Sequence, residues 1–411
     1  MENFFKLKER GTTVSREIIA GLTTFLAMAY ILAVNPGMLS AAGMSARAVF
    51  TATAVSAAIA TLVMAFVANL PVALAPGMGL NAFFTFTVVI GMGCTWQLAL
   101  TAVLVEGIIF IILSLCGIRE AIVKSIPDNL KKAVAVGIGL FIAIIGLIIT
   151  IILYTLKVPG AILIGIVITT LIGIPMGVTK IPEGFKAVSA PDAPYFFAFD
   201  WKGICMGANG FSIAVLGKFI VILITFLFTD LFDTIGTLLG VAEQGNLKDK
   251  DGNVLNAKGA LIADSVGTVV GACLGTSTVT SYVESSAGVG AGGRTGLASV
   301  VTAVLFIISL LFSQVFLLIP AAATAPALIF VGYLMMKSVV DIKFDDSTEG
   351  IPAFVTIISM PFAYSISKGI MYGIITYVIT KLCAKKAKDI PVVTWILAVI
   401  FLAEIIFEAV K

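Results

Sequence analysis

Uncharged, apolar runs recur from one end of this 411-residue chain to the other. A helix of about 18 or more apolar residues is long enough to cross the hydrocarbon core of a bilayer. Hydrophobic residues make up 59% of the chain and charged residues only 12%, which is about half the charged share of a typical soluble domain. The sequence therefore predicts an all-α polytopic membrane protein.

The apolar runs also predict where the chain crosses the membrane. The run at 351–383 contains the polar stretch SISKG, so it is expected to form either one broken span or two short ones. Residues 181–203 carry three prolines and an aromatic cluster, which predicts a loop at the level of the lipid headgroups. We expect spans at 17–36, 48–68, 76–92, 97–116, 133–156, 160–178, 217–242, 259–274, 277–291, 296–319, 322–340, 351–383 and 391–409.

The N-terminal flank carries four basic residues, Lys6, Lys8, Arg10 and Arg16, ahead of the first apolar run. Short flanks rich in Lys and Arg stay in the cytoplasm, so we expect a cytoplasmic N-terminus and a multi-pass protein of the plasma (inner) membrane. The first run lacks a small-residue cleavage site, which predicts a first span and not a removable signal.

Several function classes find no support in the composition. The five cysteines are scattered without C-x-x-C spacing and the chain has no histidine, so neither a transition-metal site nor a disulfide framework is expected. No phosphate-binding loop of the G-x-x-x-x-G-K-[ST] type is present. We expect no enzymatic activity, no metal or other cofactor, and no nucleic-acid partner.

Three pairs of segments indicate an internal repeat. TTFLAMAYILAVNPG from Thr23 is similar to ITFLFTDLFDTIG from Ile224, and WQLALTAVL at 96–104 is similar to TGLASVVTAVL at 295–305. SIPDNLKKAVAVGIGL from Ser125 is likewise similar to LIPAAATAPALIFVGYL. The same order at a nearly constant offset favours a duplication. The alternative is that apolar helices resemble one another by composition alone.

Each half contains one short span broken by glycine or proline, PVALAPGMGLNAFF in the first and GTSTVTSYVESSAGVGAGG in the second. Interrupted spans at matching positions point to a binding site near the bilayer midplane of a repeat-built transporter. The N-terminus of a half-helix offers free N–H groups, and unwound backbone at that depth is tolerated only where it is buried in protein or lines a cavity.

Acidic residues stand inside the predicted spans. Asp230 and Asp233, in the stretch FTDLFDTIGT, are three residues apart and share a helix face. Glu284 falls in the second broken span, Asn81 in the first, and Glu106 in the middle of 97–116. A charge at the bilayer centre costs about 3 kcal/mol or more, so these carboxylates are expected to face water, bind a cation or carry a proton. The alternative is that the acids satisfy helix ends or pair with loop lysines, and that Asn81 caps the half-helix.

Several blocks of the chain resemble one transporter family. TTFLAMAYILAVNP, APGMGLNAFF, TDLFDTIGTLLGVA, YVESSAGVGAGGRTGL and IPAAATAPALIFVG are similar to the adenine/guanine/hypoxanthine permease branch of the nucleobase–cation symporter superfamily. That superfamily also holds the xanthine and uracil permeases. The likeness covers nearly the whole chain.

The resemblance implies two inverted repeats of about seven spans, divided into a core domain and a gate domain, with short extended segments in the two discontinuous spans at the midplane. It divides the chain into core at 1–132, gate and interfacial loop at 133–203, core at 204–320 and gate at 321–411. The family normally has two spans where GIGLFIAIIGLIITIILYTLKV stands. The first repeat is therefore expected to be about one span short.

The resemblance also implies proton-coupled uptake of purine nucleobases by alternating access, in a protein that forms a homodimer through its gate domain. Ionised carboxylates are suited to accept the N–H and amino donors of a purine edge. Carried over by motif, substrate binding falls to Asp230, Glu284 and Asn81, proton coupling to Asp233, Asp230 and Glu284, and stacking or lining to Phe83, Phe232, Tyr282 and Thr278.

Four other functions are alternatives for a chain with these features. A transport-impaired variant would bind purines without moving them, and a transporter of xanthine or uracil would share the fold. An intramembrane aspartyl protease needs carboxylates from two helices, whereas Asp230 and Asp233 lie on one. An anion transporter would favour basic residues at the half-helix ends, where this chain has acids.

Overall fold

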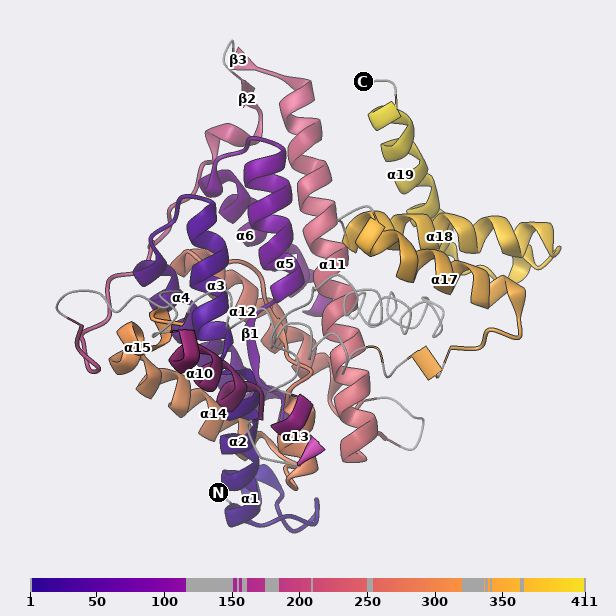
Figure 1. Ribbon diagram of the computed structural model, residues 1–411. Helices are drawn as coiled ribbons and strands as arrows, with labels where there is room; N and C mark the ends of the chain where they lie inside the picture. Colours follow the sequence, from indigo (N-terminus) through magenta and orange to yellow (C-terminus); the bar gives the residue numbers. More distant parts are fainter. Residues whose placement is uncertain are drawn as a thin grey trace.

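The computed structural model describes residues 2–115, 151–153, 155–156, 161–173, 185–207, 210–249, 254–319, 336, 339–340, 342–362 and 366–409. The expected spans at 133–156 and 322–340 lie largely outside these residues, as does the place where the first repeat is expected to be short. The described part of the chain is mostly helical (Figure 1).

The first half of the described chain runs from α1 to α10. Its elements are α1 (Glu2–Phe5), α2 (Val14–Met28), α3 (Ile31–Ala41), α4 (Ala46–Val63), the π-helical turn η1 (Met64–Ala68), β1 (Leu74–Pro76), α5 (Met78–Ala82), the π-helix η2 (Phe83–Gly91), α6 (Trp96–Leu115) and α10 (Ala161–Gly173).

The second half begins with a short hairpin and ends with three helices. Its elements are η3 (Lys202–Ile204), β2 (Met206–Gly207), β3 (Gly210–Phe211), α11 (Ile213–Gly245), α12 (Ala257–Leu274), β4 (Val279–Ser281), α13 (Ser285–Gly290), α14 (Gly296–Ser309), η4 (Leu310–Phe312), α15 (Ser313–Leu317), α17 (Ser347–Phe362), α18 (Ile366–Cys383), η6 (Ala387–Asp389) and α19 (Val392–Ala409).

Among the described residues, six helical stretches are long and apolar enough to cross a membrane. Each coincides with one of the spans expected at 17–36, 48–68, 97–116, 217–242, 259–274 and 296–319. They are Val14–Ala41, Ala46–Ala68, Trp96–Leu115, Ile213–Ala242, Ala257–Leu274 and Gly296–Leu317.

One span differs in detail from the sequence prediction, and one takes a form that the sequence allowed. The span expected to be continuous at 17–36 is two helices, α2 and α3, joined by a tight turn at Ala29 and Tyr30 that is held by short-range bonds such as Leu32 N–H to the Ala29 carbonyl (3.1 Å). The run at 351–383 is two helices, α17 and α18, which pack against each other, and this is the second of its two expected forms.

The helices lie on two sides of α11 (Figure 1). α2, α4, α6, α12 and α14 form a bundle in which α12 packs on α4 and α6, and α14 packs on α2 and α4. The helices α17, α18 and α19 lie on the opposite side of α11, where Phe228 meets Phe401 edge to face at a centroid distance of 5.7 Å.

Close helix contacts in the bundle depend on glycine. A Cβ atom on Gly21 would stand 2.4 Å from the Ala298 carbonyl oxygen, and one on Gly296 would stand 2.2 Å from the Ala65 carbonyl oxygen. These distances are shorter than any real contact, so only glycine lets α14 approach α2 and η1. Small residues serve the same purpose in other membrane bundles, where van der Waals packing drives association.

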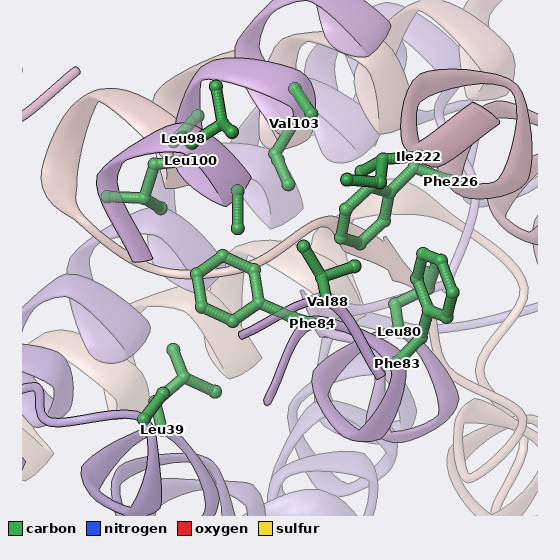
Figure 2. Close-up of a cluster of buried hydrophobic side chains, with 14 of the residues drawn as sticks. Leu39, Leu80, Phe83, Phe84, Val88, Leu98, Leu100, Val103, Ile222 and Phe226 are labelled. Carbon is green, nitrogen blue, oxygen red and sulfur yellow. The ribbon is translucent and has the colours of Figure 1, made fainter. Parts of the chain in front are cut away.

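An apolar cluster joins the first broken span to α6 and α11 (Figure 2). Phe83 packs edge to face on Phe226 of α11, with ring centroids 4.9 Å apart. Phe84 and Val88 of η2 belong to the same cluster, as does Val103 of α6. This packing fixes η2 between two of the long helices.

The two discontinuous spans pair with each other through an antiparallel ribbon of three residues in each strand. Leu74 of β1 lies opposite Ser281 of β4, and Pro76 lies opposite Val279. Beyond the ribbon, the Gly77 N–H donates to the Thr278 carbonyl (2.9 Å). The short extended segments expected in both broken spans are therefore present, and they bond to one another.

The segment expected to be an interfacial loop has no helix between residues 185 and 200. Phe196, Phe197 and Trp201 are each more than half exposed. The Tyr195 hydroxyl accepts a hydrogen bond from the Ser45 N–H (2.7 Å), which ties this loop to the start of α4.

Candidate functional site

The candidate site lies where α11 passes the β1–β4 ribbon. Thr234 of α11 donates to the Asp264 carboxylate of α12 (2.6 Å), and its hydroxyl lies 2.8 Å from that of Thr280 in β4. All three side chains are fully buried. Hydroxyl groups therefore hold α11, α12 and the ribbon in one arrangement.

Two of the predicted acids belong to one buried group. Asp233 interacts electrostatically with Asp264 and Glu284. One of its carboxylate oxygens would lie 3.5 Å from a Cβ atom at Gly77, where the ribbon passes into α5. The same Cβ atom would stand 2.6 Å from a methyl carbon of Thr280, so a larger residue at Gly77 would disturb this side of the group.

Glu284 stands between β4 and α13 and is 4% exposed. Its carboxylate accepts a hydrogen bond from the phenol of Tyr30, which lies in the turn between α2 and α3. A charge-assisted hydrogen bond of this kind is stronger than a neutral one. The turn between α2 and α3 therefore places a hydrogen-bond donor beside the Glu284 carboxylate.

Asn81 is fully buried in α5. Its side-chain oxygen accepts a hydrogen bond from the Ser277 hydroxyl, whereas its side-chain nitrogen has no hydrogen-bond partner among the described residues. The N-cap of α5 is Gly77 and not Asn81, which removes the capping alternative. A buried amide donor without a partner is rare in proteins and indicates a place for a ligand or a water molecule.

Asp230 is fully buried on α11, one turn before Thr234. Residues four apart on a helix are neighbours on its surface, so Asp230 lies on the face of α11 that meets the ribbon. Phe226, one turn earlier, is the side chain on which Phe83 packs. Asp230 is thus located between the aromatic contact and the buried acids.

Every second residue of the segment before α13 carries a hydroxyl that bonds to a different element. The partners are Asn35 of α3 for Thr276 (2.7 Å), Glu106 of α6 for Thr278 (3.1 Å), Thr234 of α11 for Thr280 (2.8 Å) and Pro76 of β1 for Tyr282 (2.6 Å).

Three of the residues expected to stack on the substrate or line the site have contacts with other elements. Thr278 and Tyr282 are bound to Glu106 and to the Pro76 carbonyl, and Phe83 packs on Phe226. The side chain of Phe232 lies outside the described residues.

Sequence reasoning missed three residues of this region. Asp264 carries the same signal as Asp230, an acid within an apolar run, and that criterion would have found it. Tyr30 and Ser277 offer no local signal, because tyrosine and serine are common in membrane helices. Among the described residues, no three His, Cys, Asp or Glu side chains lie close enough together to hold a metal ion.

The chain is similar along most of its length to known permeases. The profile of the Permease family (Xan_ur_permease) matches residues 15–148 and 141–372. The chain is 45% identical over 438 positions to the putative permease MJ0326 of Methanocaldococcus jannaschii, with 99% of this chain and 98% of the relative covered.

Two further relatives carry more specific names. The chain is 42% identical to the guanine/hypoxanthine permease PbuG of Bacillus subtilis, with 99% of this chain and 100% of that protein covered. It is 38% identical to the adenine permease AdeP of Escherichia coli, with 99% and 96% covered.

Among solved structures, the fold is similar to that of transporter membrane domains. The transmembrane domain of the cyanobacterial bicarbonate transporter BicA matches with a TM-score of 0.63 at 13% identity, covering 87% of this chain and 97% of that domain. SLC26A9 matches with a TM-score of 0.58 at 14% identity, covering 90% of this chain and 66% of that protein. At these identities the likeness shows the fold alone.

Proposed function

Because this chain belongs to the Permease family (Xan_ur_permease), we propose that it is a secondary active transporter that takes up the purine nucleobases adenine, guanine or hypoxanthine. It is a multi-pass membrane protein. Relatives that align with almost the whole chain are named guanine/hypoxanthine and adenine permeases, which supports a purine as the substrate.

One observation carries the proposal: the elements at the crossing of the two broken spans carry acidic side chains and a buried amide donor that has no hydrogen-bond partner among the described residues. Asp230 and Glu284, both buried, and the partly buried Asp233 supply carboxylate oxygens, and the buried Asn81 amide supplies N–H groups. A purine base presents ring N–H or amino donors together with ring-nitrogen acceptors, so it matches both kinds of group.

In the proposed site, Asp230 and Glu284 accept hydrogen bonds from the purine and Asn81 donates to a ring nitrogen or carbonyl group. Tyr30 orients Glu284 through its phenol. Phe83, Phe232 and Tyr282 are the proposed stacking surfaces, and Thr278 lines the site from the ribbon. No step in this scheme makes or breaks a covalent bond of the base, so neither an enzymatic activity nor a cofactor is proposed.

The proposed driving ion is the proton. Asp233 and Glu284 lie within electrostatic range of each other inside the bundle, and two like charges at membrane depth are costly unless one of them is neutralised. Protons taken up by Asp233, Asp230 or Glu284 on the outer side and released inside would couple base movement to the proton gradient. In this scheme the core moves against the gate domain by alternating access.

The proposed architecture is the pair of inverted repeats, with a cytoplasmic N-terminus and a homodimer formed through the gate domain. The two broken spans, each an extended strand followed by a short helix, support the repeat. The family profile matches in two pieces that meet at residues 141–148, and the alignment with the M. jannaschii relative runs over 438 positions, more than the 411 residues of this chain. Both facts support a first gate half that is about one span short.

Uptake and binding together test the proposal. Cells lacking their own permeases would express the protein and receive labelled adenine, guanine, hypoxanthine or uracil, with and without a protonophore, alongside equilibrium binding to purified protein. We expect saturable, protonophore-sensitive purine uptake, abolished by Asp230→Asn and retained by the exposed control Asp192→Asn. Normal uptake by Asp230→Asn would refute the site assignment.

The other outcomes separate the alternatives. Purine binding without uptake would identify a transport-impaired variant. A preference for uracil would show that the substrate is a nucleobase other than a purine.

A further inference from the structure

The proposed mechanism gives no role to Glu106, a buried acid of α6. Glu106 is the single charged residue of α6, and its side chain is fully buried. A carboxylate at the depth of a membrane span is costly, and a leucine would pack there at no such cost. The neighbours of Glu106 therefore have to explain its presence.

The position of Glu106 is fixed by a close contact between α6 and α12. A Cβ atom on the next residue, Gly107, would stand 2.8 Å from a methyl carbon of Val269 and 3.0 Å from its backbone nitrogen. Thr268, beside Val269, donates to the Val279 carbonyl of β4 (3.0 Å). The two helices and the ribbon are thus in direct contact at the level of Glu106.

From this position Glu106 reaches the second broken span. One of its carboxylate oxygens accepts a hydrogen bond from the Thr278 hydroxyl (3.1 Å). The backbone carbonyl of Thr278 accepts a hydrogen bond from the Gly77 N–H (2.9 Å). Thr278 is therefore the link between α6 and the start of α5.

The same link continues to the amide of the proposed site. The Gly77 carbonyl accepts the Asn81 N–H (2.8 Å), and Ser277, which precedes Thr278, donates to the Asn81 side chain. Two routes of hydrogen bonds thus run from the Thr278 segment to Asn81, one through the backbone and one through a side chain. A shift of Thr278 would move Asn81 along both.

We propose that Glu106 is a positioning residue for the purine site, which acts through Thr278 to hold the Asn81 amide in register with the base. This inference rests on the proposed function, and it adds a residue that does not touch the substrate. The effect is carried by the hydrogen bond in which Glu106 is the acceptor and Thr278 the donor.

A double-mutant cycle tests the link. Glu106→Leu and Thr278→Val should each weaken purine binding about tenfold, the loss expected when a hydrogen bond to a charged group is removed. The double variant should bind as each single variant does, because both break one interaction. Glu106→Gln keeps an acceptor, so it should bind like the unaltered protein. Thr278→Ser keeps a donor, so it should bind more tightly than Thr278→Val.

Ser114→Ala is the matched control. Ser114 is buried on α6 two turns beyond Glu106 and faces Ser265 of α12 (3.5 Å), so its removal perturbs the same helix contact without touching the ribbon. Binding should not change. Should Glu106→Leu fail to fold, the comparison of Thr278→Val with Thr278→Ser and of Glu106→Gln with the unaltered protein decides the case.

A second readout separates positioning from a general loss of structure. In deaza analogues a ring nitrogen is replaced by C–H, which removes one acceptor from the base. The analogue that lacks the acceptor for Asn81 should bind the unaltered protein about tenfold more weakly than its parent. In Glu106→Leu this difference should nearly vanish, because the amide no longer meets the base.

Each outcome bears on a separate claim. Absence of purine binding by the unaltered protein would overturn the proposed function, and this inference with it. Equal binding by the unaltered protein and Glu106→Leu, additive losses in the double variant, or an undiminished deaza difference would overturn this inference alone.

Discussion

Replacing Glu17 of α2 should destabilise the protein by several kcal/mol, on the order expected for the loss of a buried charged acceptor. Its carboxylate is fully buried and accepts hydrogen bonds from the N–H groups of Arg294 (2.8 Å), Thr295 (3.2 Å) and Ala298 (3.2 Å), and from the Thr295 hydroxyl (2.8 Å). The first N–H groups of a helix have no acceptor within that helix. The Glu17 carboxylate of α2 provides acceptors for the N–H groups at the start of α14.

The contacts set the magnitude. Glu17→Leu leaves three backbone N–H groups and one hydroxyl without their charged acceptor. A buried donor that loses its hydrogen bond costs about 1–3 kcal/mol. The Thr295 hydroxyl already caps the Leu297 N–H (3.3 Å) and partly compensates. We expect a loss of about 3–5 kcal/mol, above the 0.5–2 kcal/mol or so of an ordinary cap.

Thermal unfolding of the purified protein in detergent measures this loss, with every variant heated at the same rate because unfolding of large proteins is often irreversible. A loss of this size should lower the Tm by about 5 °C or more. Glu9→Leu is the control: it makes the same chemical change at an exposed residue that pairs with Lys6 (3.4 Å). If the two variants melt within a degree or two of each other, the capping argument is wrong.

Three further changes have defined outcomes. Tyr30→Phe removes the hydroxyl that donates to the Glu284 carboxylate, so purine affinity should fall about tenfold. Unchanged affinity would show that Tyr30 has no role in the site. Gly296→Val would force a Cβ atom to 2.2 Å from a backbone oxygen of η1 and should lower the Tm sharply, whereas Gly217→Ala, with nothing within 4 Å, should not. Asp346 accepts hydrogen bonds from the side chain and backbone of Thr348, which lower its pKa from 3.8 to about 2. A depressed carboxyl pKa stabilises the fold above the unfolded value, so Asp346→Asn should lower the Tm equally at pH 5 and pH 8, and the difference from the unaltered protein should disappear as the pH falls through about 2. A difference that grows on acidification would contradict that sign.

The spans and their breaks were predictable because they follow from local composition. The glycine and proline of APGMGLNAFF and the glycine, serines and threonines of GTSTVTS mark the places where helix and extended chain meet. The exception is the break at Ala29 and Tyr30, which contains neither residue. Pro36 stands later in the run, inside α3. Proline position alone would therefore have put this break in the wrong place.

Partner choice was not predictable. The hydroxyl of Thr278 bonds to Glu106, 172 residues away, and that of Tyr30 to Glu284, 254 residues away. Nothing near either residue in sequence specifies which of several buried acids it will meet. An acid within a span indicates a functional group, whereas the donor that orients it becomes visible only when the helices are packed.

The pairing of β1 with β4 has a consequence for the order of synthesis. Pro76 leaves the ribosome long before Tyr282, its partner 206 residues later. At about 5–20 residues per second this interval is roughly 10–40 s. During that time the backbone groups of β1 have no strand to pair with, and in lipid each unpaired group costs several kcal/mol.

The first broken span therefore cannot reach its final place in the bilayer while the second half is still being made. It has to wait in water, in the insertion machinery or against other protein until Val279–Ser281 arrives. The ribbon of the proposed site can close only once Val279–Ser281 has been made, after α12 and before α13. A truncated chain that stops before β4 should be held by the insertion machinery or degraded, however hydrophobic its completed helices are.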